Sequence, residues 1–190
     1  MKPLPSQLSR RSFFHQTLLS AAATGATWFD VPQLIADTRD ASLLKYGGFP
    51  MGIQSYSLRG FGVDGALDKI QELELHHVEF FRMHFPPTPD ASKIEAMNAK
   101  LSQRDISISA HGVESFSSDH QANETFFKFA KKAGIRNISA NPQPDSFESL
   151  NRLVAQYNIR IAIHNHGPGA LYDSPLDGLK AVAGYDKRIG

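Results

Sequence analysis

The chain alternates strand-like and helix-like segments from Gly48 to its last residue, and this alternation limits the fold more than any other feature. The expected strands lie two to three dozen residues apart, with amphipathic segments between them, and are centred near Ile53, Val78, Ser107, Ile138 and Ile161. This spacing is typical of βαβ units, in which crossover helices join parallel strands. The sequence therefore predicts an α/β fold with a parallel sheet.

Turn and cap residues mark where the elements begin and end. We expect strands over 51–57, 77–81, 106–112, 137–142 and 160–166, and helices over 66–75, 90–103, 123–132, 147–157 and 176–182. Gly134 stands where a helix C-cap glycine belongs, and Ser174-Pro175 is a cap followed by proline at the first helical position. Residues 187–190 predict the start of a sixth strand.

Polar residues end several of the expected strands, which favours a curled sheet over an open one. That layout is typical of a (β/α)₈ barrel, whose active site is built at the carboxyl ends of its strands. A doubly wound open sheet is the alternative, but no Gly-rich phosphate loop follows the first strand. A full barrel takes about 250 residues, so the sequence predicts an incomplete one with about five units and the start of a sixth.

Composition excludes several classes of function. Hydrophobic residues make up 41% of the 190 residues and the formal net charge is +1. Without residues 1–40 the basic and acidic residues are equal in number, so no electrostatic footprint for nucleic acid is expected. The sequence has no cysteine, which excludes disulfides and thiolate chemistry.

The first 40 residues resemble an export signal rather than part of a domain. Ser9-Arg10-Arg11-Ser12-Phe13-Phe14 is a twin-arginine pattern, and a mildly apolar run over 18–26 follows it. We expect a bacterial protein exported by the twin-arginine route to the periplasm or beyond. The apolar run is too short and too polar for a stable membrane span. The domain is therefore expected over 41–190.

The fifth expected strand carries the strongest chemical pattern, His164-Asn165-His166 before Gly167-Pro168-Gly169. Alternation along a strand places His164 and His166 on one face and Asn165 on the other. Two imidazoles at this spacing can both point at one metal ion, whereas the alternative is a pair of histidines that hydrogen-bond loop carbonyls.

Other strand ends supply further candidates. His111 ends a strand of alternating isoleucine and serine, and we expect it to ligate a metal, to act as a base or to lie beneath the next loop. Glu79 lies within a strand, so it is either paired with Arg59 or Arg82 or an acid/base residue. Glu114 is expected in a solvated loop. The remaining strand-end candidates, expected to contact substrate, are Gln54, Tyr56, Asn141 and Asn165.

With these residues in view, residues 48–190 resemble the sugar phosphate isomerase/epimerase superfamily, whose fold is a xylose isomerase-like TIM barrel. The resemblance rests on four segments taken in order, at 52–59, 110–113, 129–135 and 161–168. Secreted twin-arginine members with a His-Asn-His-Gly-Pro segment form one branch of this superfamily.

The resemblance implies a divalent metal (Zn, Mn, Mg or Co) at the barrel mouth and a small carbohydrate substrate whose adjacent carbons exchange a proton. The superfamily places a glutamate where this chain has His164, and its later Asp-x-Gly-His element would follow Gly190. The alternatives are a metal-dependent hydrolase or lyase on the same barrel and an inactive, truncated fragment. Such a chain can form homo-oligomers. We expect His111, His164 and His166 to open into one cavity, and an isolated chain of this length to bind metal weakly without isomerase activity.

Overall fold

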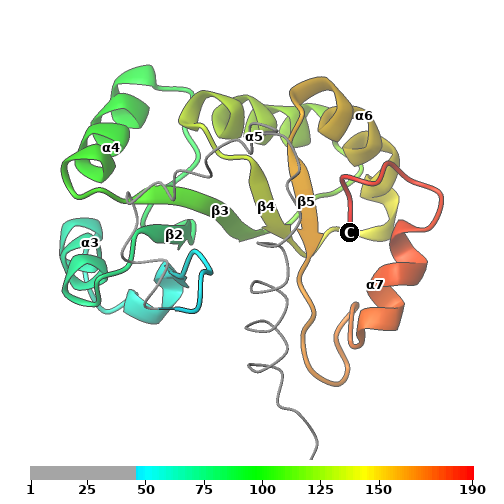
Figure 1. Ribbon diagram of the computed structural model, residues 1–190. Helices are drawn as coiled ribbons and strands as arrows, with labels where there is room; N and C mark the ends of the chain where they lie inside the picture. Colours follow the sequence, from blue (N-terminus) through cyan, green and yellow to red (C-terminus); the bar gives the residue numbers. More distant parts are fainter. Residues whose placement is uncertain (1–45) are drawn as a thin grey trace, which may run out of the picture. The chain divides into compact units, whose positions relative to one another are not determined.

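The computed structural model describes residues 46–190, whose strands form one five-stranded parallel sheet (Figure 1). The strands lie side by side in sequence order: β1 (Gly52–Gln54), β2 (His77–Phe80), β3 (Ser107–Glu114), β4 (Asn137–Ala140) and β5 (Arg160–Ile163). All four neighbouring pairs are parallel. The predicted α/β class with a parallel sheet is therefore confirmed for this part of the chain.

A helix follows each strand, and the helices carry the labels of Figure 1. They are α3 (Val63–Glu72), α4 (Ala91–Gln103), α5 (His120–Ala133), α6 (Phe147–Tyr157) and α7 (Pro175–Val182), with short 3-10 helices η1 (Ser55–Leu58) and η2 (Pro144–Ser146). Gly134 ends α5 in the left-handed region at φ 78°, as predicted. Ser174 and Asp177 form a capping box at the start of α7, with Pro175 at its first position.

The two faces of the sheet differ in burial. Val78, Phe80, Ile138 and Ile161 point toward the helices and are at most 2% exposed. In Figure 1, α4, α5 and α6 lie along one side of β3, β4 and β5. The residues on the other side are exposed or half-buried, and we call this side the open face; it presents Gln54, His77, Glu79, Ser107, Ser109, Ser139, Arg160 and Ala162. The open face is therefore mainly polar, whereas the helix side holds most of the apolar core.

The last residues of the chain begin to pair with β5 as a sixth parallel strand. Ile189 pairs with Ile161, and the backbone N–H of Ile163 donates to the carbonyl of Gly190 at 2.7 Å. The side chain of Ile189 is buried. The expectation that residues 187–190 start another strand is thus confirmed to the extent of one bridge.

The first strand is shorter than predicted. Gln54 ends β1 because its side-chain oxygen accepts the backbone N–H of Tyr56 at 2.8 Å, which caps η1. A side chain that hydrogen-bonds the backbone two residues ahead competes with strand pairing. Residues 55–58 therefore leave the sheet as a helical turn.

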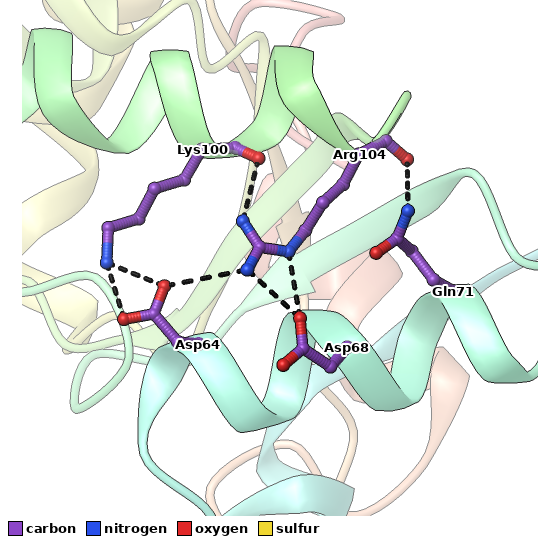
Figure 2. Close-up of polar contacts among 5 residues, drawn as sticks. All are labelled: Asp64, Asp68, Gln71, Lys100 and Arg104. Carbon is purple, nitrogen blue, oxygen red and sulfur yellow. Dashed lines mark hydrogen bonds and ion pairs between the residues drawn. The ribbon is translucent and has the colours of Figure 1, made fainter.

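Helices α3 and α4 are joined on the surface by a set of ion pairs (Figure 2). Lys100 donates to Asp64 at 2.6 Å, and Arg104 donates to Asp68 at 3.0 Å through two of its nitrogens. Gln71 also reaches the carbonyl of Arg104 at 3.5 Å. These contacts fix the relative orientation of two helices whose apolar sides pack onto the sheet.

No helix between residues 46 and 190 is long and apolar enough to cross a membrane. The twin-arginine segment and the predicted boundary at residue 40 lie outside the described residues.

Candidate functional site

The open face holds a pocket of about 290 Å³ over β1, β2 and β3. Its polar lining consists of Gln54, His77, Glu79 and Ser109. Gln54 lies level with Glu79 in the β1–β2 pairing, close to the carboxyl ends of both strands. An amide, an imidazole, a carboxylate and a hydroxyl on one wall can donate and accept hydrogen bonds with a polyhydroxylated molecule.

Glu79 is a half-buried carboxylate with no hydrogen-bond or ion-pair partner among residues 46–190. The two arginines considered for it are engaged elsewhere. Arg82 pairs with Glu114, and the Arg59 guanidinium lies 4.5 Å from the centre of the Tyr56 ring. The structural role proposed for Glu79 therefore has no partner to support it, and its oxygens remain available on the open face.

Gln54 and Tyr56 lie at the rim of this pocket. The Gln54 amide donates to the carbonyl of Gly112 at 3.2 Å, which ties β1 to β3 across the open face of β2. Tyr56 is 53% exposed and packs edge-on against Phe81. Both are accordingly placed where a substrate can reach them.

His111 does not lie on the open face, which corrects the expectation that it opens into a cavity. Val78 is level with Ile108 but Glu79 with Ala110, so one extra residue, Ser109, interrupts the pairing of β2 with β3. Such a bulge reverses the alternation of all later side chains. His111 consequently lies level with Phe80 on the helix side of the sheet.

The His111 ring is fully buried among aromatic rings. It lies 5.5 Å from Phe126 and 5.6 Å from Phe129 between ring centres. Its Nε2 lies 2.9 Å from the carbonyl of Phe85, and because a carbonyl only accepts, Nε2 carries the proton. This position leaves His111 no surface for direct contact with a substrate or an outside metal ion.

Glu114 was expected in a solvated loop but is 1% exposed at the end of β3. A second register shift puts Glu114 level with Ala140, on the same helix side as His111. Its Oε1 lies 3.2 Å from Nδ1 of His111 without the geometry of a hydrogen bond, and its Oε2 accepts from Nη2 of Arg82. Simple alternation gives no signal for this cluster, because two bulges create it.

His164 and His166 lie beside each other, with ring centres 4.5 Å apart. His164 is half-buried at the end of β5 and His166 is exposed. The structure does not bring His111 to them, since His111 is enclosed on the helix side. Within 46–190, no three His, Asp or Glu side chains are grouped closely enough to hold a metal ion.

A metal centre usually takes three or four protein ligands, so two imidazoles do not fit a complete one. Within residues 46–190, the expected metal ligands are therefore present only as a pair.

Asn141 and Asn165 occupy the loops after β4 and β5. The backbone N–H of Asn141 donates to the carbonyl of Glu114 at 2.8 Å, and its side chain is half-buried. Asn165 donates from its side chain to the carbonyl of Tyr172 at 3.5 Å. Tyr172 is buried and anchors this loop through its hydroxyl, which donates to the carbonyl of Pro142 at 2.7 Å; burial raises the pKa of Tyr172.

Two larger cavities, each about 450 Å³, open at the other end of β3 and β4, where Arg136 and Gly134 line both. That end of a parallel α/β sheet normally serves stability. Neither cavity contains a candidate from the sequence.

No protein-family profile and no curated protein matches this chain. Several solved structures do match, including the following two. An uncharacterised protein from Parabacteroides distasonis ATCC 8503 matches with a TM-score of 0.61 and 24% identity over 73% of this chain and 60% of that one. A protein from Sinorhizobium meliloti 1021 matches with a TM-score of 0.59 and 11% identity over 74% and 61%. This chain thus spans about 60% of the length of these structures, and at such identities the likeness shows the fold alone.

Proposed function

We propose that this chain is part of a xylose isomerase-like (β/α)₈ barrel whose open face binds a small carbohydrate and moves a proton between its adjacent carbons. The barrel is supported by the sequential strand order and by helices packed on one face of the sheet. The chemistry is supported above all by Glu79, a carboxylate in a polar pocket that has no partner within residues 46–190.

In this proposal Glu79 is the base. It takes the proton from the hydroxyl-bearing carbon beside the sugar carbonyl and returns it to the former carbonyl carbon. The proton of that hydroxyl passes to the former carbonyl oxygen, so the substrate is rearranged without an external oxidant or reductant. Gln54 holds a substrate hydroxyl, because one of its two amide N–H groups remains after the bond to Gly112. Tyr56 packs against the sugar ring from the rim.

We also propose that a divalent metal binds at His164 and His166, which would supply two of its donors. A bound divalent ion supplies polarisation of a carbonyl or hydroxyl oxygen. The pair of imidazoles is set at the carboxyl end of β5, and Asn141 and Asn165 lie in the loops beside it.

A direct test follows the proton. In deuterium oxide, a panel of aldoses and ketoses incubated with the chain should gain deuterium at the carbon next to the carbonyl, a partial reaction that needs the base but not a completed isomerisation. Glu79→Gln should abolish this exchange, whereas Glu95→Gln, which changes an exposed glutamate on α4, should leave it unchanged. Equal exchange with Glu79→Gln would remove Glu79 from the chemistry, and no exchange in the unaltered chain would favour a non-catalytic fragment.

We also propose export by the twin-arginine route, from the Arg10-Arg11 pattern in the sequence. Replacing both arginines with lysine should hold the protein in the cytoplasm. Fractionation of cells that express the two forms measures this, and unchanged export of the lysine form would refute the signal.

A further inference from the structure

A cavity of about 450 Å³ lies at the amino-terminal ends of β4 and β5, and it shares no lining residue with the pocket that contains Glu79. The loop from α5 to β4 and the loop from α6 to β5 form its walls. These loops are tied together, because the backbone N–H of Arg160 donates to the carbonyl of Arg136 at 2.9 Å. The volume of the cavity lies in the range of sites that bind small molecules.

Positively charged residues dominate the lining of this cavity. Lys131, Arg136 and Arg160 line it, and no aspartate or glutamate among the described residues does. Within 46–190, neither arginine side chain donates a hydrogen bond or pairs with a carboxylate. Lys131 donates to the carbonyl of Tyr157 at 3.4 Å and has no carboxylate partner in this range either. Each guanidinium therefore keeps all five of its N–H donors for a ligand.

Asn158 adds a neutral donor to the same wall. Its side-chain Oδ1 accepts a hydrogen bond from Nη1 of Arg188 at 3.3 Å, and Arg188 is itself paired with Asp186. The amide nitrogen of Asn158 has no acceptor among residues 46–190. The cavity is therefore lined by charged and neutral donors, without a carboxylate in its lining to neutralise them.

The competing explanation is that these cations only offset the negative carboxyl ends of α5 and α6. Backbone groups already satisfy part of both ends. The N–H of Ile135 donates to the carbonyl of Ala130 at 2.9 Å, and the N–H of Ile159 donates to a carbonyl of α6 at 3.3 Å. Lys131 does contact the end of α6, but the two arginines donate to no carbonyl in the described part of the chain. That explanation therefore leaves both guanidinium groups without a role.

We infer that this cavity is a second binding site, and that its ligand is a small molecule with a diphosphate group. The planar fork of arginine donates two parallel hydrogen bonds to phosphate oxygens. One phosphate group carries about −1.5 to −2 charges at pH 7, so two linked groups balance three cations better than one does. The inference does not depend on the isomerase proposal, because the two sites have no residue in common.

Titration calorimetry of the full chain with pyrophosphate tests the cavity, in a buffer whose chelator removes divalent cations. The unaltered chain should bind pyrophosphate, and inorganic phosphate should bind about tenfold more weakly. Arg136→Gln and Arg160→Gln should each weaken pyrophosphate binding about tenfold, the loss expected for one hydrogen bond to a charged group. Arg152→Gln is the matched control, because Arg152 is an exposed arginine of α6 that does not line the cavity.

A nucleoside diphosphate in the same titration distinguishes the sources of the diphosphate group. Tighter binding than pyrophosphate identifies a nucleotide, and equal binding identifies the diphosphate group alone. The inference is overturned if pyrophosphate does not bind, if phosphate or citrate binds as tightly, or if both cavity variants bind as well as Arg152→Gln. The competing explanation predicts another result, in which Arg136→Gln and Arg160→Gln lower the denaturation midpoint and the unaltered chain binds no pyrophosphate.

Discussion

His111 lies within β3 and His164 directly follows β5 of the same sheet, yet the two lie in opposite environments. His111 is enclosed by aromatic rings, the Phe85 carbonyl and Glu114. His164 is half-buried, and its only ring contact within 46–190 is with His166. Both are histidines near the carboxyl end of a strand, so the register of the strand decides which of them can meet a ligand.

The comparison predicts a large difference in stability when each ring is removed. His111→Ala should lower the free energy of unfolding by about 3–5 kcal/mol, because it empties a packed aromatic site and leaves Glu114 without its neighbour. His164→Ala should change it by less than about 0.5 kcal/mol, as is usual away from the core. Chemical denaturation of both variants measures this. Equal losses would mean that the two environments do not differ as described.

Gly112 offers a second way to test the packing around β3. A Cβ at this position would lie 2.2 Å from the carbonyl oxygen of Ser139, which is backbone and cannot move aside. Gly112→Ala should therefore cost about 1–3 kcal/mol or more of stability. Gly60→Ala is the matched control, since nothing lies within 4 Å of its added Cβ. A tolerated Gly112→Ala would show that β4 does not approach β3 this closely.

The order of elements could be predicted from the sequence because it depends on local chemistry. Apolar runs, the C-cap glycine Gly134 and the Ser174-Pro175 start of α7 each act within a few residues, and all three are found. Residues 187–190 also begin a pairing with β5 as predicted.

The side of the sheet on which each site residue lies could not be predicted in the same way. Alternation alone puts His111 on the same side as Ser107 and Ser109, but the bulge at Ser109 turns it to the helix side. A second shift brings Glu114 beneath Arg82. These shifts are set by how neighbouring strands fit together, which no local pattern in β3 records.

Zinc binding tests the other side of the comparison between His111 and His164, namely whether the accessible histidines can bind a ligand. His164 and His166 together should bind zinc weakly, because two imidazoles leave the remaining positions to water. Replacing both with alanine should abolish binding, and His120→Ala, which changes a histidine that bonds Ser149 at the start of α5, should not. Competition with a chromophoric chelator measures it. Zinc binding that survives the double replacement would place the metal elsewhere.

The smallest effect is expected for the ion pairs on the surface between α3 and α4 (Figure 2). The hydrogen bond from Lys100 holds the pKa of Asp64 below its ordinary value. A carboxyl with a lowered pKa stabilises the fold above its unfolded pKa and loses that contribution as the pH falls through the folded value. Asp64→Asn should therefore be slightly less stable than the unaltered chain at pH 7, and the two should converge in high salt and as the pH falls below the lowered pKa of Asp64 in the folded chain.

Glu114 should be much less sensitive to salt than Asp64. The Glu114 carboxylate at the end of β3 is buried, so dissolved ions screen it poorly. Glu114→Gln should therefore lose stability by the same amount in low and in high salt, whereas the loss in Asp64→Asn should fade. Denaturation midpoints of both variants at two ionic strengths make the comparison. If salt weakened both losses alike, the carboxylate at Glu114 would be open to solvent, and Arg82 would no longer be anchored from a buried site.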